Sequence, residues 1–183
     1  MGILAIALRP HAIDRGRGDF FTDRSYNFET VRVLDDIAVA GGDASDVLTT
    51  VSSIRAGNAD DWYRAWTAAG DHTAALAGRT HDVRSKGTAL LRAHTYYRTA
   101  EFFLSPTDPR RAASFKSNVG AFYEGLDALK VSYERIAVPY GHYHLNAVYY
   151  PGPAGSDARP LLVVVGGYDS TLEELYLLDV SGR

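Results

Sequence analysis

Apolar residues are arranged differently in the two parts of the chain. Up to about Lys130 they recur every three or four positions in Ala-rich stretches, which is the spacing of helices that bury one face. After Lys130, β-branched and tyrosine-rich runs follow one another, separated by glycine and proline. The pattern predicts a helical domain over residues 1–129 and a second, β-containing domain over residues 130–183.

The helical spacing predicts five amphipathic helices in the first domain. They cover about residues 28–38, 47–54, 60–69, 85–104 and 110–126. Asp43 or Ser45 can cap the second of these helices, and Asn58 and Asp60 can open the third. Before the fifth, Asp108 is the expected N-cap, and Pro109 suits the first helical position.

The second domain begins with two runs that predict a strand pair. Val131–Val138 and Tyr143–Tyr150 have this character, with a turn expected around Pro139–His142. Leu161–Val165 is a continuous apolar run, as expected for a strand buried on both faces of a mostly parallel sheet. A helix is expected from Leu172 to about Val180. These elements predict an α/β fold with three strands and one helix after the helical domain.

The junction between the third predicted strand and the last helix carries candidate chemistry. Gly-Gly-Tyr-Asp at residues 166–169 forms the turn, and Ser170 and Glu173 match a capping box at the helix start. Two glycines allow a sharp turn and a close ligand, and the helix start adds N–H groups and a positive dipole end. The turn is therefore a candidate site for an anion or oxyanion. The alternative is a tight turn alone, because such junctions occur in many doubly wound proteins.

Composition and charge exclude several classes of function. The chain has 183 residues, of which 46% are hydrophobic, and this is enough to bury a core. Its net charge is -3, with Lys+Arg 19 and Asp+Glu 22 interspersed, so nucleic acid is not an expected partner. The absence of cysteine excludes disulfides, thiolate nucleophiles and Cys-based metal sites.

No membrane segment or signal peptide is expected. The apolar start Met1–Leu8 lacks a basic region and is interrupted at Arg9 and Pro10. No other apolar run approaches membrane-spanning length, so we expect a cytoplasmic protein with no membrane partner.

Isolated histidines and Ser170 have simpler explanations than catalysis. His142 and His144 alternate at the start of a strand, but no partner stands at metal-motif spacing, so no metal is expected. We expect His94 to be a hydrogen-bonded, half-buried side chain of a helix and not a catalytic base. Helix capping accounts for Ser170 without a nucleophilic role.

Three stretches together resemble one family. The run Leu161–Tyr176, the helix motif Asp61–Trp66 and the helix–break–helix segment Tyr96–Arg111 are similar to a bacterial and fungal α/β-hydrolase family with an N-terminal helical cap. That family includes 2,6-dihydroxypseudooxynicotine hydrolase and the polyketide-shortening hydrolases of fungal pigment synthesis. The resemblance extends from about Asn27 onward, with the motifs in the same order.

The resemblance implies a fold and an activity. The fold is a helical cap, followed by the first three strands and first helix of an α/β-hydrolase core whose sheet is incomplete. The activity is that of a Ser–Asp–His hydrolase that cleaves carbon–carbon bonds of β-diketone-like small molecules, or esters, without a cofactor. Family members also imply that the helical domain could form a homodimer.

The resemblance also implies roles for particular residues. The backbone N–H groups of Tyr168 and Asp169 would stabilise the oxyanion, with Gly167 next to the substrate. Four aromatic residues are candidates for lining the substrate pocket, and their alternative role is core packing: Trp66, Tyr96, Tyr97 and Phe103.

The sequence departs from the family at the nucleophile. It contains no G-x-S-x-G, and the triad in this fold follows on later strands. We therefore expect the N-terminal part of a hydrolase, inactive and marginally stable by itself, with an exposed apolar sheet edge. The alternative is a non-catalytic helical module for binding or assembly.

Overall fold

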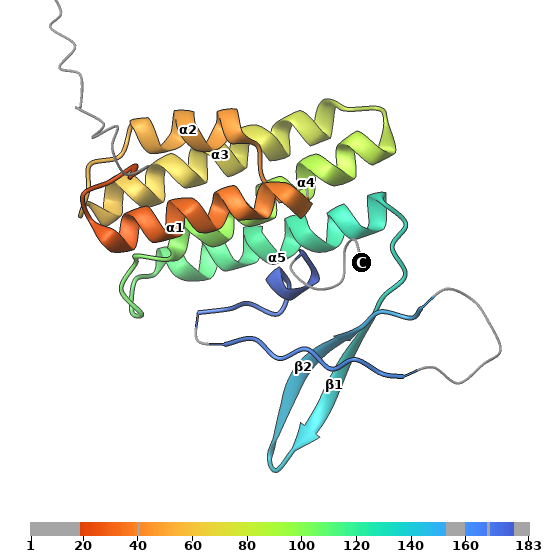
Figure 1. Ribbon diagram of the computed structural model, residues 1–183. Coiled ribbons are helices and arrows are strands. Elements are labelled where there is room, and N and C mark those ends of the chain that lie inside the picture. Colours follow the sequence, from red (N-terminus) through yellow and green to blue (C-terminus); the bar gives the residue numbers. More distant parts are fainter. Residues whose placement is uncertain (1–18, 40, 153–159, 168, 178–183) are drawn as a thin grey trace, which may run out of the picture.

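The computed structural model describes residues 19–39, 41–152, 160–167 and 169–177, and most of them are helical (Figure 1). Its helices are α1 (Arg24–Asp35), the short 3-10 helix η1 (Asp36–Val39), α2 (Ala44–Ser52), α3 (Ala59–Arg79), α4 (Val83–Glu101) and α5 (Arg110–Ala128). In the bundle α4 packs between α3 and α5, and α1 contacts both α2 and α4. No helix within these ranges is long and apolar enough to cross a membrane.

Short polar side chains cap the helices α1, α2, α3 and α4. Asp23, Asp43, Asn58 and Asp82 each accept a backbone N–H from the first turn of the following helix. Asp43, and not Ser45, is therefore the cap of α2.

The start of α5 differs from its prediction by one residue. Pro109 occupies the cap position and offers no side-chain acceptor, because the proline ring carries no oxygen. Asp108, the residue before Pro109, supplies the acceptor instead. Its carboxylate accepts the N–H of Arg110 at 2.9 Å.

Glycine lets the long helices approach each other closely. A Cβ atom on Gly87 of α4 would lie 2.5 Å from Leu129 Cγ and 3.0 Å from the carbonyl oxygen of Gly125 in α5. A Cβ atom on Gly70 would lie 2.7 Å from the ring of Tyr97. This close packing explains why α3 continues through Gly70 to Arg79, beyond its predicted end at Ala69.

Two buried clusters form the core. The first is aromatic and joins α1, α3 and α4, with Phe21, Tyr26, Trp62, Trp66 and Tyr96 among its buried members. The indole N–H of Trp62 donates to the carbonyl oxygen of Thr99 at 2.7 Å, which satisfies the polar atom of a side chain with no exposed surface. The second cluster packs the C-terminal residues Tyr176 and Leu177 onto α4 and α5.

The sheet is a two-stranded hairpin that extends away from the bundle (Figure 1). Strands β1 (Glu134–Tyr140) and β2 (Tyr143–Tyr149) pair antiparallel from Glu134–Tyr149 to Tyr140–Tyr143. Gly141 makes the turn with a φ of 58°, so the turn is tighter than the one expected around Pro139–His142.

The predicted third strand does not form within the described residues. Leu161–Val165 has no ladder hydrogen bonds, and Leu161, Leu162, Val163 and Val165 are 72–84% exposed. A strand of this composition is stable between two neighbouring strands with both faces covered. The described chain offers it neither, so the prediction of a three-stranded sheet with this run buried is wrong for this structure.

Candidate functional site

In the described part of the turn after Leu161–Val165, one residue has a left-handed backbone conformation. Asp169 adopts a left-handed φ of 67°, a conformation that aspartate tolerates better than most residues, whereas Gly166 and Gly167 do not have positive φ. Gly166 is required for space, because its Cβ would lie 2.8 Å from Ser170 Cβ. The space beside Gly167 is open, since a Cβ atom at this residue would meet no atom within 4 Å. Tyr168 lies outside the described residues.

The described residues 174–177 after the turn are helical, and a capping box one residue later than predicted precedes them. Thr171 Oγ1 accepts the N–H of Glu174 at 3.4 Å, and Glu174 Oε2 accepts the N–H of Thr171 at 3.4 Å. The predicted partner Glu173 instead accepts the hydroxyl of Tyr123 on α5 at 3.4 Å. The prediction of a Ser170–Glu173 box is therefore wrong by one residue, because contacts with the bundle select Glu174.

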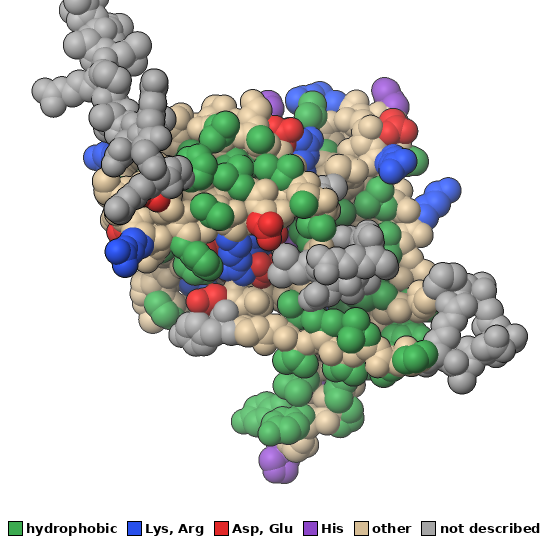
Figure 2. Space-filling view, viewed as in Figure 1, with side chains coloured by type: hydrophobic (Ala, Val, Ile, Leu, Met, Phe, Trp, Pro, Cys, Tyr) green, Lys and Arg blue, Asp and Glu red, His purple; other side chains and the backbone are tan. Residues whose placement is uncertain are grey.

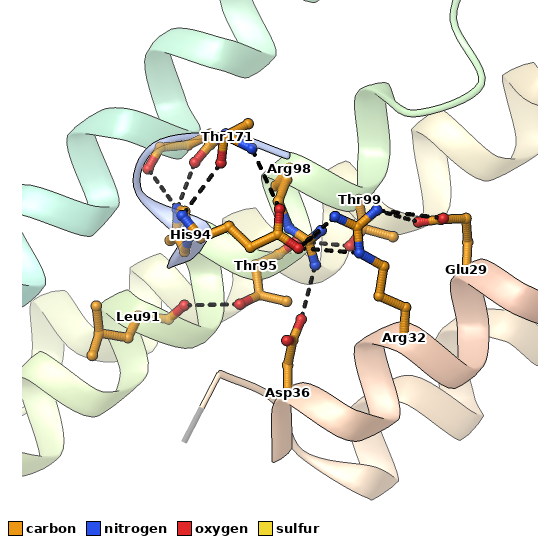
Figure 3. Close-up of polar contacts among 11 residues, drawn as sticks. Glu29, Arg32, Asp36, Leu91, His94, Thr95, Arg98, Thr99 and Thr171 are labelled. Carbon is orange, nitrogen blue, oxygen red and sulfur yellow. Dashed lines mark hydrogen bonds and ion pairs between the residues drawn. The ribbon is translucent and has the colours of Figure 1, made fainter. Parts of the chain in front are cut away.

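Those contacts form a buried ion-pair network between the turn and the bundle, and Figure 3 shows its arrangement. Arg98 of α4 donates to Glu174 Oε1 at 2.7 Å and to Asp36 Oδ2 at 2.8 Å. Arg32 of α1 donates to Glu174 Oε1 through Nε at 3.1 Å, and it lies 3.5 Å from Glu29. Four separate elements thus meet at one group of charges.

The network is nearly dry. Glu29, Asp36 and Glu174 are each 1% exposed, and Arg98 is 6% exposed. Burial raises the pKa of Asp36 to about 6, although the Arg98 guanidinium acts in the opposite direction. Burial likewise raises the pKa of Glu29. Three carboxylates share two guanidinium groups, and the raised pKa of Asp36 favours protonation of this side chain at mildly acidic pH.

A pocket of about 440 Å³ lies beside the turn. It is lined by Arg98, Glu101, Phe102, Arg111, Ala112, Phe115, Asp169, Ser170 and Thr171. The carboxylate of Glu101 lies 4.0 Å from the Arg111 guanidinium, and burial raises the pKa of Glu101. Three of the lining residues are apolar, namely Phe102, Ala112 and Phe115, and the other six are polar or charged.

Comparison with known proteins finds relatives by sequence. No family model matches the sequence. The hydrolase acrC of Aspergillus aculeatus is 34% identical over 176 residues, covering 86% of this chain and 41% of the relative. The 20-hydroxy-prefusarin hydrolase FUS2 of Gibberella moniliformis is 33% identical (88% and 41%), and the α/β hydrolase ucsC of an Acremonium species is 29% identical (88% and 37%).

This chain is a homologue of fungal hydrolases that include an α/β hydrolase. The resemblance inferred from the sequence motifs is thereby confirmed. The chain spans about two fifths of the length of these relatives.

The structure of this hydrolase homologue brings only part of the predicted site together. Gly167 and Asp169 lie at the turn beside the pocket. Trp66, Tyr96 and Phe103 lie in the aromatic core, which corresponds to the alternative role of core packing.

The remaining predicted aromatic residue, Tyr97, packs against Gly70 of α3, and its hydroxyl donates to Asp71 at 2.8 Å. None of the four predicted aromatic residues is among the side chains that line the pocket beside Asp169. Their role in substrate binding stays a prediction.

His94 is packed in the interior of the helical bundle. It has no exposed surface, more buried than expected, and its Nδ1 lies 2.5 Å from Asn118 Oδ1. Burial lowers the pKa of His94 to about 3, with Arg98 acting in the same direction. The ring is therefore neutral near pH 7, in keeping with the expectation of a packed side chain.

Sequence reasoning missed the ion-pair network. Arg98 follows His94 by four residues, so both lie on the apolar face of α4, and a charge in that position was the available signal. The partners of Arg98 could not be found from local spacing, because Glu174 is 76 residues away and Asp36 is 62 residues away.

Proposed function

We propose that this chain forms the helical cap and the first core elements of a serine α/β-hydrolase. The observation that carries the proposal is the sharp turn at Asp169, which leads into a box-capped helix and faces a pocket. In the α/β-hydrolase fold, a loop in this position provides one backbone donor of the oxyanion hole. The homology to fungal hydrolases supports the same assignment.

The proposed reaction is acyl transfer to a serine that lies outside these 183 residues. The serine oxygen attacks a substrate carbonyl while a histidine takes its proton. A backbone N–H of the turn at Tyr168 or Asp169 helps to stabilise the resulting oxyanion, together with a second donor that follows the nucleophile. Collapse breaks the ester bond, or the carbon–carbon bond of a β-diketone-like substrate, and the histidine returns the proton to the leaving group. Water then releases the acyl group, so no cofactor is needed.

The 183 residues contain no G-x-S-x-G, so we propose that they are inactive alone. The test is p-nitrophenyl acetate hydrolysis by this chain, by a longer protein that continues through the nucleophile, and by its Ser→Ala variant. Turnover only by the longer protein with its serine intact supports the proposal. Turnover by the 183-residue chain that survives repurification contradicts it.

An alternative function, a non-catalytic module for assembly, is favoured by one observation. Phe28 and Val31 lie on one face of α1 and are 65% and 47% exposed, and Figure 2 shows hydrophobic side chains on the surface of the bundle. Sedimentation of the chain beside a Phe28→Glu variant tests this alternative. A dimer that the substitution dissociates, together with an inactive longer protein, would favour it.

A further inference from the structure

We propose that Arg98 and Glu174 are positioning residues through which the cap fixes the geometry of the oxyanion turn. This inference rests on the proposed function, because it concerns the turn to which that function assigns the oxyanion donors. It adds a role for the helical bundle besides covering the substrate: the bundle sets the backbone that contacts the reacting oxygen.

The two carboxylate oxygens of Glu174 accept hydrogen bonds from different partners. Oε2 accepts the N–H of Thr171, two residues after the left-handed Asp169. Oε1 accepts hydrogen bonds from Arg98 at 2.7 Å and from Arg32 at 3.1 Å. A shift of the Arg98 guanidinium therefore moves the carboxylate that holds the backbone of the turn.

Arg98 is itself held from both sides. Its Nη1 donates to Glu174 and its Nη2 donates to Asp36, at 2.7 and 2.8 Å, so the planar guanidinium has a fixed orientation between them. At 6% exposure, water does not compete effectively for these bonds. The position of the turn is therefore fixed relative to η1 and α4 through Asp36, Arg98 and Glu174.

A buried ion pair often contributes little to the net stability of a protein. Well-packed hydrophobic residues of similar volume often give equal or greater stability, because charges lose their hydration on burial. The charges add orientation here, since the two terminal nitrogens of Arg98 donate to carboxylates on different elements, Glu174 and Asp36. Arg98 also lines the pocket together with Asp169 and Thr171, so this orientation is imposed where a ligand would bind.

The first experiment measures amide hydrogen exchange in the 183-residue chain. Arg98→Met and Glu174→Gln should each accelerate exchange over residues 169–177 about tenfold, while amides of α3 change less than about twofold, as expected for local opening. Arg98→Lys, which retains the charge without the planar fork, should give an intermediate rate. Equal rates in all variants, or one uniform rise across the chain, would overturn the proposal.

Arg92→Met is the matched control. Arg92 is also on α4, but its guanidinium lies 3.8 Å from the partly exposed Asp43 and Asp46, and it does not line the pocket beside the turn. This variant should leave exchange over residues 169–177 unchanged. Acceleration equal to that of Arg98→Met would overturn the proposal by showing a general loosening of α4.

The second experiment measures ester hydrolysis by the longer protein. Glu174→Gln and Arg98→Met should lower kcat about tenfold or more while KM stays within about twofold. The reason is that a displaced N–H donor stabilises the transition state less but affects substrate binding little. Arg98→Lys should recover part of kcat. An unchanged kcat in a protein with accelerated exchange would overturn the proposal, whereas an inactive wild-type longer protein would overturn the proposed function instead.

Discussion

The guanidinium of Arg98 lies 2.7 Å from the carboxylate of Glu174, which follows it by 76 residues in the sequence. Arg98 belongs to α4 at the centre of the helical bundle, and Glu174 begins the helix after the candidate oxyanion turn. Their contact is a direct polar link between these two parts, and Asp36 and Arg32 hold it in place.

Replacing Arg98 by methionine should lower the free energy of unfolding by about 3 kcal/mol, because Glu174 and Asp36 would remain buried without their shared counter-charge. Urea unfolding at pH 7 measures this difference. Arg92→Met, which removes a more exposed arginine of the same helix, should change it by about 0.5 kcal/mol or less. Equal effects of the two substitutions would contradict the account of the network.

Stability should depend on pH through His94. Its folded pKa of about 3 lies below the value of about 6.5 in an unfolded chain, so the unfolded state binds the proton first as the pH falls. This contribution to stability is present above about pH 6.5 and is lost progressively towards pH 3. Between pH 7 and pH 5, the wild type should lose about 2 kcal/mol relative to His94→Gln.

The titration of Asp36 changes stability with pH in the opposite direction over part of this range. Its folded pKa of about 6 exceeds its unfolded value, so its contribution falls as the pH rises from about 4 to 6. For this reason the measurement compares denaturation curves of wild type and His94→Gln at each pH, which leaves the contribution of Asp36 common to both. Parallel pH profiles would show that His94 is not buried as a neutral ring.

Replacing glycine by alanine should have opposite effects on stability at Gly87, which is crowded, and at Gly78, which has open space beside it. Gly87→Ala should destabilise the chain by about 1–3 kcal/mol, because the added methyl would lie 2.5 Å from Leu129 Cγ. Gly78→Ala on α3 meets no atom within 4 Å and should stabilise it by up to about 1 kcal/mol through helix propensity. Thermal unfolding of both variants checks the prediction, which fails if both shift the midpoint in the same direction.

The helices were predictable because their signals are local. Apolar spacing and capping residues such as Asp43 and Asn58 act within a few positions, so the sequence indicates where α2 and α3 begin. The third strand was not predictable in the same way, since Leu161–Val165 is a strand only where neighbouring strands exist.

The site was predictable only in outline. The turn after residue 165 follows from its glycines and the adjacent capping pattern, but the choice of Glu174 over Glu173 depends on Arg98 and Arg32, which are distant in sequence. Likewise, aromatic residues such as Trp66 and Tyr96 have the composition of pocket walls and of cores alike. Only their packing in three dimensions distinguishes the two.

The most direct test of the central claim is a crystal structure of the longer protein after inactivation by diethyl p-nitrophenyl phosphate, which leaves a tetrahedral phosphoryl group on a reactive serine. The account predicts a phosphoryl oxygen within about 3.1 Å of a backbone nitrogen of residues 167–169. It also predicts that Glu174 remains bound to Arg98. A phosphoryl oxygen held only by groups elsewhere, with this turn pointing away, would contradict the account.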